Sequence, residues 1–188
     1  MFYFHMERTG CDNASSVRYH KTMQGCSRVV AIPVENGSDG LLLLLNENIP
    51  ENYDVYFNGW DRTNSISLSG VGIHHPGGDF KKISTYGNHL PSSTSWTNSD
   101  SNKEGAINAH WNIIFDETAN GHSVTEGGSS GSPVFNQNKL IIGTLSGGNS
   151  SCKKPDGINL YGKMFYHWDK YSQADTGRMD KWLDPIGS

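Results

Sequence analysis

The chain has 188 residues, of which 15 are Lys or Arg and 19 are Asp or Glu, and its formal net charge at pH 7 is −4. This length is sufficient for one domain or for two small lobes with a shared core. The acidic balance argues against binding to nucleic acids or anionic membranes, because both require a basic surface. The longest apolar run, Leu41 to Leu45, is too short to cross a membrane.

The composition favours short strands joined by turns. Glycine accounts for 22 residues and aromatic residues make up 11% of the chain, and both are typical of β-structure with many turns. The single helix that the sequence predicts begins after Thr176 and ends before Pro185. The spacing of the other segments predicts an all-β barrel or sandwich. In chain order, strands are expected at 2–6, 29–34, 41–45, 53–60, 66–74, 109–115, 133–135, 140–145 and 160–166.

The chain contains three cysteines, Cys11, Cys26 and Cys152. An odd number means that at least one thiol of an exported protein has no partner within the chain. Cys11 and Cys26 could close a hairpin. Alternatively, the partner cysteines lie outside these residues.

Residues 127–133 read Gly-Gly-Ser-Ser-Gly-Ser-Pro and lead directly into a predicted hairpin. A nucleophilic serine requires an exposed hydroxyl on a tight turn and backbone N–H groups that converge on the developing oxyanion. It also requires close approach of the backbone to the substrate, which favours glycine. This segment can supply all three features, although a simple Gly/Ser loop between strands would have the same composition.

The segment Gly128-Ser129-Ser130-Gly131-Ser132-Pro133 resembles the Gly-x-Ser-Gly-x-Pro motif of chymotrypsin-fold serine endopeptidases. Together with the later Ser146-Gly147-Gly148, it is most similar to the bacterial lysyl-endopeptidase branch, and weaker matches follow in order between residues 39 and 185. The resemblance implies a single peptidase domain over 1–188, all-β, with a chymotrypsin-like double β-barrel. Residues 1–85 would form the remainder of an incomplete first barrel, 105–175 the second barrel, and 176–184 the C-terminal α-helix.

The resemblance also implies roles for individual residues. Ser130 would be the nucleophile, and the N–H groups of Gly128 and Ser130 would form the oxyanion hole. Asp39 would be the triad carboxylate, because its separation from Ser130 suits the chain order of the family; the alternative is a turn residue. Ser129 stands where many relatives carry Asp, so no buried ion pair is expected there. The residues expected to bind substrate are Val124, Thr125, Ser146, Gly147, Gly148 and Asn159.

The expected specificity pocket differs from that of the family. Trypsin-like enzymes carry an acid where this chain has Val124, and lysyl endopeptidases carry one where it has Asn159. An amide cannot replace a carboxylate as the counter-ion of a buried ammonium group. Therefore either Asp156 reaches into the pocket or the enzyme does not prefer Lys.

The general-base histidine of the family would fall before Met1, about 45 residues ahead of the triad carboxylate. The resemblance therefore predicts an N-terminally truncated and nearly inactive chain. A non-catalytic, protease-like peptide-binding domain and a carbohydrate-binding β-module remain alternatives. We expect a peptide or protein substrate, no cofactor or metal, no nucleic-acid or membrane partner, and a monomer. The family resemblance implies a secreted or cell-surface location.

Overall fold

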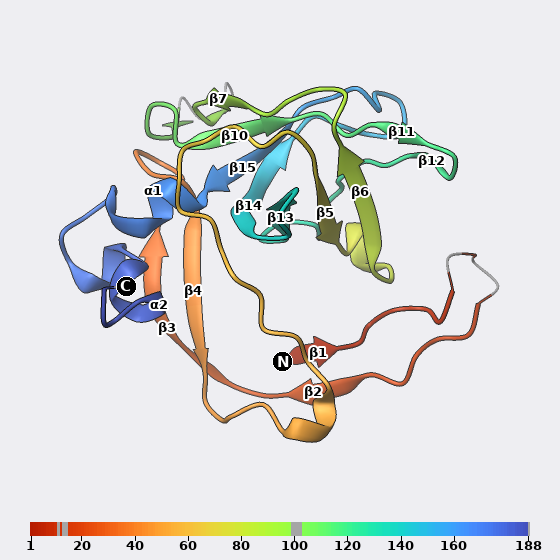
Figure 1. Cartoon of the computed structure of the whole chain (residues 1–188), viewed down its shortest axis with the longest axis horizontal. Coiled ribbons are helices and arrows are strands. Elements are labelled where there is room, and N and C mark those ends of the chain that lie inside the picture. The colour runs from red at the N-terminus through yellow and green to blue at the C-terminus, as the bar shows by residue number, and fades with distance from the viewer. Residues whose placement is uncertain (11, 13–14, 99–102, 188) are drawn as a thin grey trace.

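The computed structural model describes residues 1–10, 12, 15–98 and 103–187 (Figure 1). Seven strands form the main sheet in the order β6-β5-β13-β14-β15-β10-β7, and every neighbouring pair is antiparallel. These strands are β5 (Gly70–His74), β6 (Lys82–Tyr86), β7 (Ser92–Thr94), β10 (His110–Ile113), β13 (Pro133–Asn136), β14 (Ile141–Gly148) and β15 (Asn159–Lys163).

The main sheet encloses an apolar core that fixes β5 beside β13. The rings of Phe115 and Tyr161 meet edge to face with centroids 6.4 Å apart. A Cβ at Gly72 would lie 3.0 Å from the Phe115 ring, so β5 approaches this core more closely than a side chain would allow. The core consists of Tyr86, Trp111, Ile113, Phe115, Val134, Ile142, Leu145 and Tyr161.

The N-terminal part forms an arc beside the main sheet (Figure 1). It contains two separate two-stranded sheets. Strand β1 (Phe2–Phe4) pairs with β2 (Lys21–Met23), and β3 (Cys26–Ile32) pairs with β4 (Gly40–Leu45). Because neither pair joins further strands, this lobe is an incomplete barrel in the described part of the chain.

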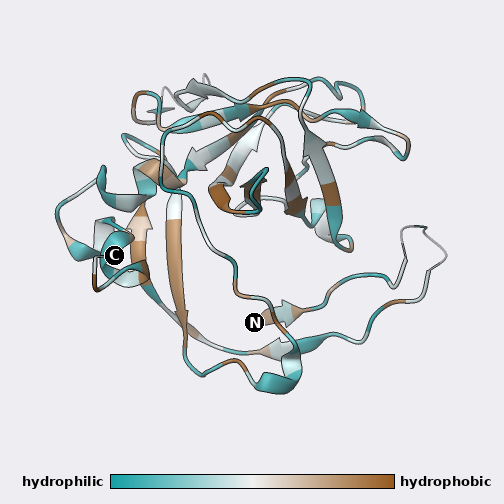
Figure 2. Cartoon of the chain, viewed as in Figure 1, coloured by the Kyte–Doolittle hydropathy of each residue, from teal (hydrophilic) through white to brown (hydrophobic). Residues whose placement is uncertain are grey.

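A second core joins this lobe to the C-terminal segment. Val30 and Ile32 of β3 pack against Met164 and Trp168 of α1 (Met164–Asp169), together with Met179. The outer surface of β4 is less well covered and stands out as a hydrophobic strand in Figure 2. The short remaining elements are η1 (Glu51–Tyr53), η2 (Pro76–Gly78), β8 (Thr97–Asn98), β9 (Lys103–Glu104), β11 (Glu117–Thr118), β12 (Gly121–His122), η3 (Asp175–Gly177) and α2 (Asp180–Leu183).

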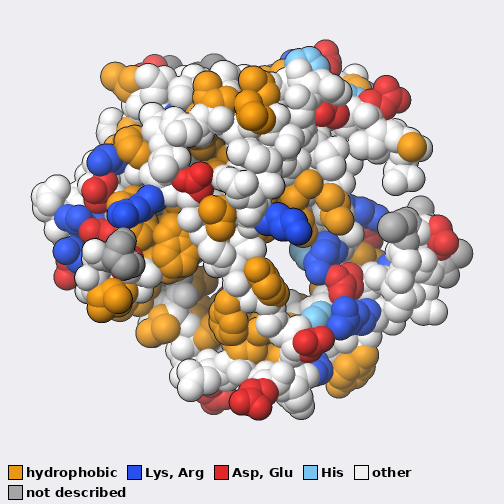
Figure 3. Space-filling model, in the orientation of Figure 1, with side chains coloured by type: hydrophobic (Ala, Val, Ile, Leu, Met, Phe, Trp, Pro, Cys, Tyr) orange, Lys and Arg blue, Asp and Glu red, His pale blue; other side chains and the backbone are white. Residues whose placement is uncertain are grey.

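Figure 3 shows an opening between the N-terminal arc and the main sheet, bordered by hydrophobic and basic side chains. The incomplete first lobe therefore leaves part of the surface between the two lobes uncovered. None of the helices in the described ranges is long and apolar enough to span a membrane.

The structure confirms the predicted β-rich architecture with an incomplete first lobe and a C-terminal helix, and it corrects four details. Strands β5 and β6 pair with the main sheet, so the second lobe begins near residue 70 and not near 105. The C-terminal helix expected over 176–184 is reduced to α2 and the preceding turn η3. The lobe boundary differs from the predicted one because strand pairing between distant segments decides which lobe a hairpin joins.

Two predicted strands also end differently. The strand expected over 160–166 ends at Lys163 and α1 follows, because Met164 and Trp168 are spaced to face the second core together on a helix. Residues 53–60 contribute no paired strand apart from a bridge between Trp60 and Ile141. Tyr56 and Phe57 in that segment are 88% and 77% exposed, so its alternating pattern has no surface to pack against.

Candidate active site

The serine-rich turn lies immediately before β13 and has a well-defined backbone. The amide of Ser129 donates to the carbonyl of Glu126 at 3.0 Å, and the amide of Ser132 donates to the carbonyl of Ser129 at 3.1 Å. The amide of Gly131 donates to Leu145 of β14 at 2.8 Å, which ties the turn to the main sheet. The turn is therefore held both by its own hydrogen bonds and by its neighbour in the sheet.

Two glycines allow the backbone to take this path. Gly128 and Gly131 have φ angles of +95° and +78°, in a region that disfavours side chains. A Cβ at Gly128 would also lie 3.1 Å from the carbonyl oxygen of His75. Glycine is thus required at 128 both by the backbone conformation and by the close approach of the loop at 75–78.

The turn borders a cavity of about 420 Å³ that is lined by Ile73, His74, His75, Phe135 and residues 128–133. We call this cavity the Ser130 cup. Ser130 is exposed, whereas the preceding Ser129 is completely buried. Within the described residues, the amides of Gly128 and Ser130 have no hydrogen-bond acceptor, although the amide of Ser129 between them has one. The turn that lines the cup thus has an exposed serine and two N–H groups without an acceptor in the described structure.

A buried histidine lies directly behind the turn. Nδ1 of His74 is 2.9 Å from Oγ of Ser129, and Nε2 is 2.8 Å from Oγ of Ser84 on β6. Burial, and next the charge of His75, lowers the pKa of His74 below its ordinary value of 6.5, which favours the neutral ring. The only feature of the sequence that relates to this arrangement is the pair of adjacent histidines, which on a strand point to opposite faces.

The structure places Asp39 on the turn between β3 and β4. Asp39 is exposed and has a φ of 58°, and within the described residues it makes no side-chain hydrogen bond to Ser130 or to a histidine. The preceding Ser38 is completely buried, and its Oγ is 2.8 Å from Nδ1 of His167. A Cβ at Gly162 of β15 would clash with the carbonyl of Ser38. The turn that carries Asp39 therefore packs directly against β15 of the main sheet.

The edge of β14 beyond Leu145 is available for another strand. Ser146, Gly147 and Gly148 lie at the end of β14, and this end pairs with β15 on one side, while the pairing with β13 stops at Thr144. Oγ of Ser146 also lies 3.2 Å from Nε2 of His110. Burial, and next the charge of Lys163, lowers the pKa of His110 to about 4. The geometry thus leaves a strand edge of the kind to which a peptide backbone can bind.

Asn159 is completely buried and its amide is satisfied inside the protein. Its Oδ1 accepts hydrogen bonds from Thr125 and Ser150 at 2.6 and 2.7 Å, and its Nδ2 donates to the carbonyl of Ile113 at 3.1 Å. Ser150 was not identified from the sequence. Val124 is half-buried, and Asp156 is exposed, so Asp156 does not supply a buried carboxylate beside Asn159.

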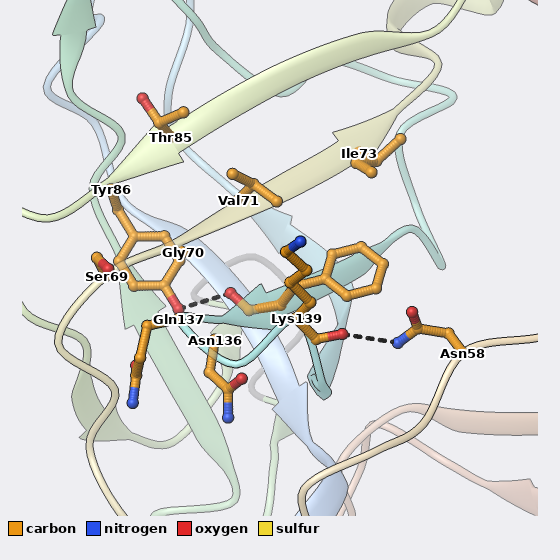
Figure 4. Close-up of a pocket in the computed structure, with 11 residues that line it drawn as sticks. Asn58, Ser69, Gly70, Val71, Ile73, Thr85, Tyr86, Asn136, Gln137 and Lys139 are labelled. Carbon is orange, nitrogen blue, oxygen red and sulfur yellow. Dashed lines mark hydrogen bonds between the residues drawn. The ribbon is translucent and has the colours of Figure 1, made fainter.

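A larger hollow of about 630 Å³ lies beside the Ser130 cup, between β5, β6 and the hairpin β13–β14 (Figure 4). Ile73 and Phe135 line both cavities. Two hydrogen bonds hold its walls, from the hydroxyl of Tyr86 to the carbonyl of Phe135 and from Nδ2 of Asn58 to the carbonyl of Lys139. The cup therefore continues into a mostly apolar hollow on the outer face of β5.

Cys26 and Cys152 are free, exposed thiols, and Cys11 lies outside the described residues. The disulfide pairing of the three cysteines therefore stays a prediction. Among the described residues, no three His, Cys, Asp or Glu side chains gather in a way that could hold a metal ion.

A sequence model of the lysyl endopeptidase C-terminal domain matches residues 1–162. Among solved structures, the chain is similar to Rv3671c from M. tuberculosis, a serine-to-alanine mutant in the inactive form, with 13% identity and a TM-score of 0.47 over 73% of this chain. It is also similar to the inactive form of the Rv3671c protease, with 14% identity and a TM-score of 0.47 over 87% of this chain. The chain spans 58% and 66% of the lengths of these two structures.

Proposed function

Because the chain belongs to the lysyl endopeptidase C-terminal domain family, we propose that it is part of a serine endopeptidase in which Ser130 is the nucleophile. The observation that carries the proposal is the Ser130 cup, where the exposed Ser130 shares a turn with the amides of Gly128 and Ser130, which have no acceptor in the described structure. Oγ of Ser130 would attack the carbonyl carbon of the substrate, and these two amides would donate to the resulting oxyanion.

The substrate backbone would pair with the open edge of β14 at Ser146, Gly147 and Gly148. Val124, Thr125 and Asn159 would border the pocket for the substrate side chain. Because Asn159 is neutral and its amide is used internally, we propose that this pocket does not select Lys through a buried carboxylate.

Asp39 would orient a histidine general base, as in the family. In the described structure, no histidine nitrogen is hydrogen-bonded to Oγ of Ser130. We propose that this base comes from chain outside residues 1–188, so that residues 1–188 alone are nearly inactive. Loss of the base costs about 10⁶ in turnover, although an oxyanion hole retains about 10³ to 10⁴ over the reaction in water. For the complete protein, the proposal includes secretion, a monomeric state and a reaction without cofactor.

The test is chemical rescue of residues 1–188 by free imidazole, which can replace the missing base. The protein is treated with an alkyl fluorophosphonate with and without imidazole, and the labelled residue is identified by peptide mass spectrometry. We expect slow labelling of Ser130 that imidazole accelerates at least 10-fold and that Ser130→Ala abolishes. Ser65→Ala, at an exposed serine outside the cup, is the matched control and should be labelled like the unmodified chain. Equal labelling of Ser130→Ala would refute the assignment.

In the described part of the chain no histidine is hydrogen-bonded to Ser130, and this also favours a second candidate, a non-catalytic domain that binds peptides along β14. That function predicts no labelling of Ser130 even with imidazole, and peptide binding that Ser130→Ala leaves unchanged. A carbohydrate-binding module has less support. It needs a row of exposed aromatic rings, but of the five tryptophans Trp111 and Trp168 are buried, Trp60 and Trp96 are half-buried, and only Trp182 is exposed. The exposed rings of Tyr56 and Phe57 lie in a different segment from Trp182.

A further inference from the structure

We propose that His74 is a positioning residue for the Ser130 cup: linked to Ser84 and Ser129, it holds the turn in the conformation that directs the amides of Gly128 and Ser130 into the cup. This inference rests on the proposed function of the cup. It assigns a role to a histidine that the triad does not use.

The hydrogen bond between His74 and Ser129 can hold the turn because of where Ser129 lies. Ser129 lies between the two residues whose amides form the cup, and its backbone already donates to Glu126 and accepts from Ser132. Its side chain is completely buried and bonds to His74. Any rotation of the peptide groups on either side of Ser129 would have to break this side-chain bond or one of the two backbone bonds.

His74 in turn connects the turn to the rigid part of the molecule. It ends β5, and Ser84, its second partner, lies on β6, which pairs with β5 through the register Gly72↔Ser84. Both strands belong to the main sheet, with β13 beside β5. The chain of contacts from Ser84 through His74 to Ser129 therefore transmits the position of the sheet to the turn.

The neutral ring of His74 carries one proton and one free lone pair on its two nitrogens. It therefore donates to one of the two serine hydroxyls, Ser129 or Ser84, and accepts from the other. Oγ of Ser129 also accepts from the amide of Glu126 at 3.4 Å. Both ring nitrogens of His74 and the hydroxyl of Ser129 thus have a partner, and the contact needs no charged group.

The same contacts argue that His74 is not itself the general base. Both of its ring nitrogens are hydrogen-bonded to serines, Ser129 and Ser84. Both serines are completely buried and cannot contact a substrate. The effect of His74 on Ser130 is transmitted through Ser129. A substitution should therefore act according to whether it preserves the bond to Ser129.

Three variants separate positioning from general loss of structure. His74→Asn places an amide where Nδ1 lies and can still bond to Ser129, whereas His74→Gln places it near Nε2, beside Ser84. His74→Phe retains the ring and removes both bonds. With imidazole and the alkyl fluorophosphonate, we expect labelling of Ser130 to fall at least 10-fold in His74→Phe and His74→Gln. A misaligned oxyanion donor costs between about 10² and 10³, which accounts for this loss. His74→Asn should recover most of the rate, because it preserves the bond to Ser129.

Amide hydrogen exchange gives a readout that does not depend on catalysis. The Ser132 amide, which donates to the carbonyl of Ser129, should exchange at least 10-fold faster in His74→Phe and His74→Gln than in His74→Asn. The amide of Lys163, which donates to Ala109 elsewhere in the main sheet, should be unaffected. If His74→Phe does not fold, Ser129→Ala removes the same bond and should show the same two effects.

The outcomes distinguish the two proposals. If the unmodified chain is never labelled at Ser130, the proposed function fails, and the exchange of the Ser132 amide alone decides the role of His74. If exchange and labelling change equally in His74→Asn and His74→Gln, or follow only the loss of thermal stability, the positioning role is refuted.

Discussion

Lowering the pH from 7 to 5 should destabilise this protein, because two of its buried histidines, His110 and His167, strongly resist protonation in the folded state. His167 is almost inaccessible, and its two nitrogens lie 2.8 Å from Oγ of Ser38 and 3.2 Å from Oγ1 of Thr144. Burial, and next the charge of His110, lowers the pKa of His167 to about 3. Burial and the charge of Lys163 lower the pKa of His110 to about 4.

The size of the effect follows from these values. In the unfolded chain both histidines take up protons near pH 6.5, whereas the folded protein resists protonation until pH 4 or below. Because their folded pKa values are lowered, the two groups contribute full stability above pH 6.5, and this contribution is lost as the pH falls towards the folded values. Between pH 7 and pH 5 the loss is about 2 kcal/mol for each histidine and about 4 kcal/mol together. That is a large part of a typical unfolding free energy of about 5–15 kcal/mol.

Urea unfolding at pH 7, 6 and 5 measures this loss directly. The side chains of Glu7, Asp79 and Asp180, whose pKa values are lowered from 4.5 and 3.8, titrate below this range and contribute little to it. His167→Gln should be less stable at pH 7 but should lose only about half as much between pH 7 and pH 5. His110→Gln should also be less stable at pH 7 and should also lose about half as much stability between pH 7 and pH 5. An equal loss in all three proteins, or a loss below about 1 kcal/mol in the unmodified chain, would refute the reasoning.

Three further predictions concern stability and association. Asn159→Asp removes a buried donor and places a carboxylate beside backbone carbonyls, so urea unfolding should show a loss of about 1–3 kcal/mol. Ser38→Ala leaves Nδ1 of His167 without its partner and should cost about 1–3 kcal/mol by the same measurement. Leu41 and Leu43 of β4 are 56% and 37% exposed beside an open strand edge. Light scattering should therefore show self-association that increases with concentration and that a Leu41→Lys, Leu43→Lys double variant reduces.

The strands that the sequence predicted best are those whose apolar residues meet a core and whose ends carry turn residues. The segments predicted at 109–115 and 140–145 contain β10 and most of β14, and they bury Trp111, Ile113, Ile142 and Leu145. The segment at 160–166 could not be predicted in the same way. Its final residues are apolar and are compatible with a strand or a helix. The helix forms because it packs Met164 against β3.

The serine turn was predictable because its requirements are local. Glycines with positive φ at 128 and 131 and an exposed serine between them are consequences of a short motif. The support behind the turn was not predictable, because His74 is distant from Ser129 in sequence and contacts it only through strand pairing, as Ser84 on β6 contacts His74. Likewise, nothing in the sequence indicated that the amide of Asn159 would be satisfied by two hydroxyls.

The two turns that carry the proposed triad residues share one design. In each, the residue before the proposed catalytic side chain is a completely buried serine, and its Oγ lies within 2.9 Å of Nδ1 of a buried histidine: Ser38 with His167, and Ser129 with His74. A serine anchored inward forces the next side chain outward, which accounts for the exposure of Asp39 and Ser130. The pKa values of both histidines are lowered by burial, so protonation would place a buried charge behind each turn. Acid should therefore disturb the two turns together, even though they belong to different lobes.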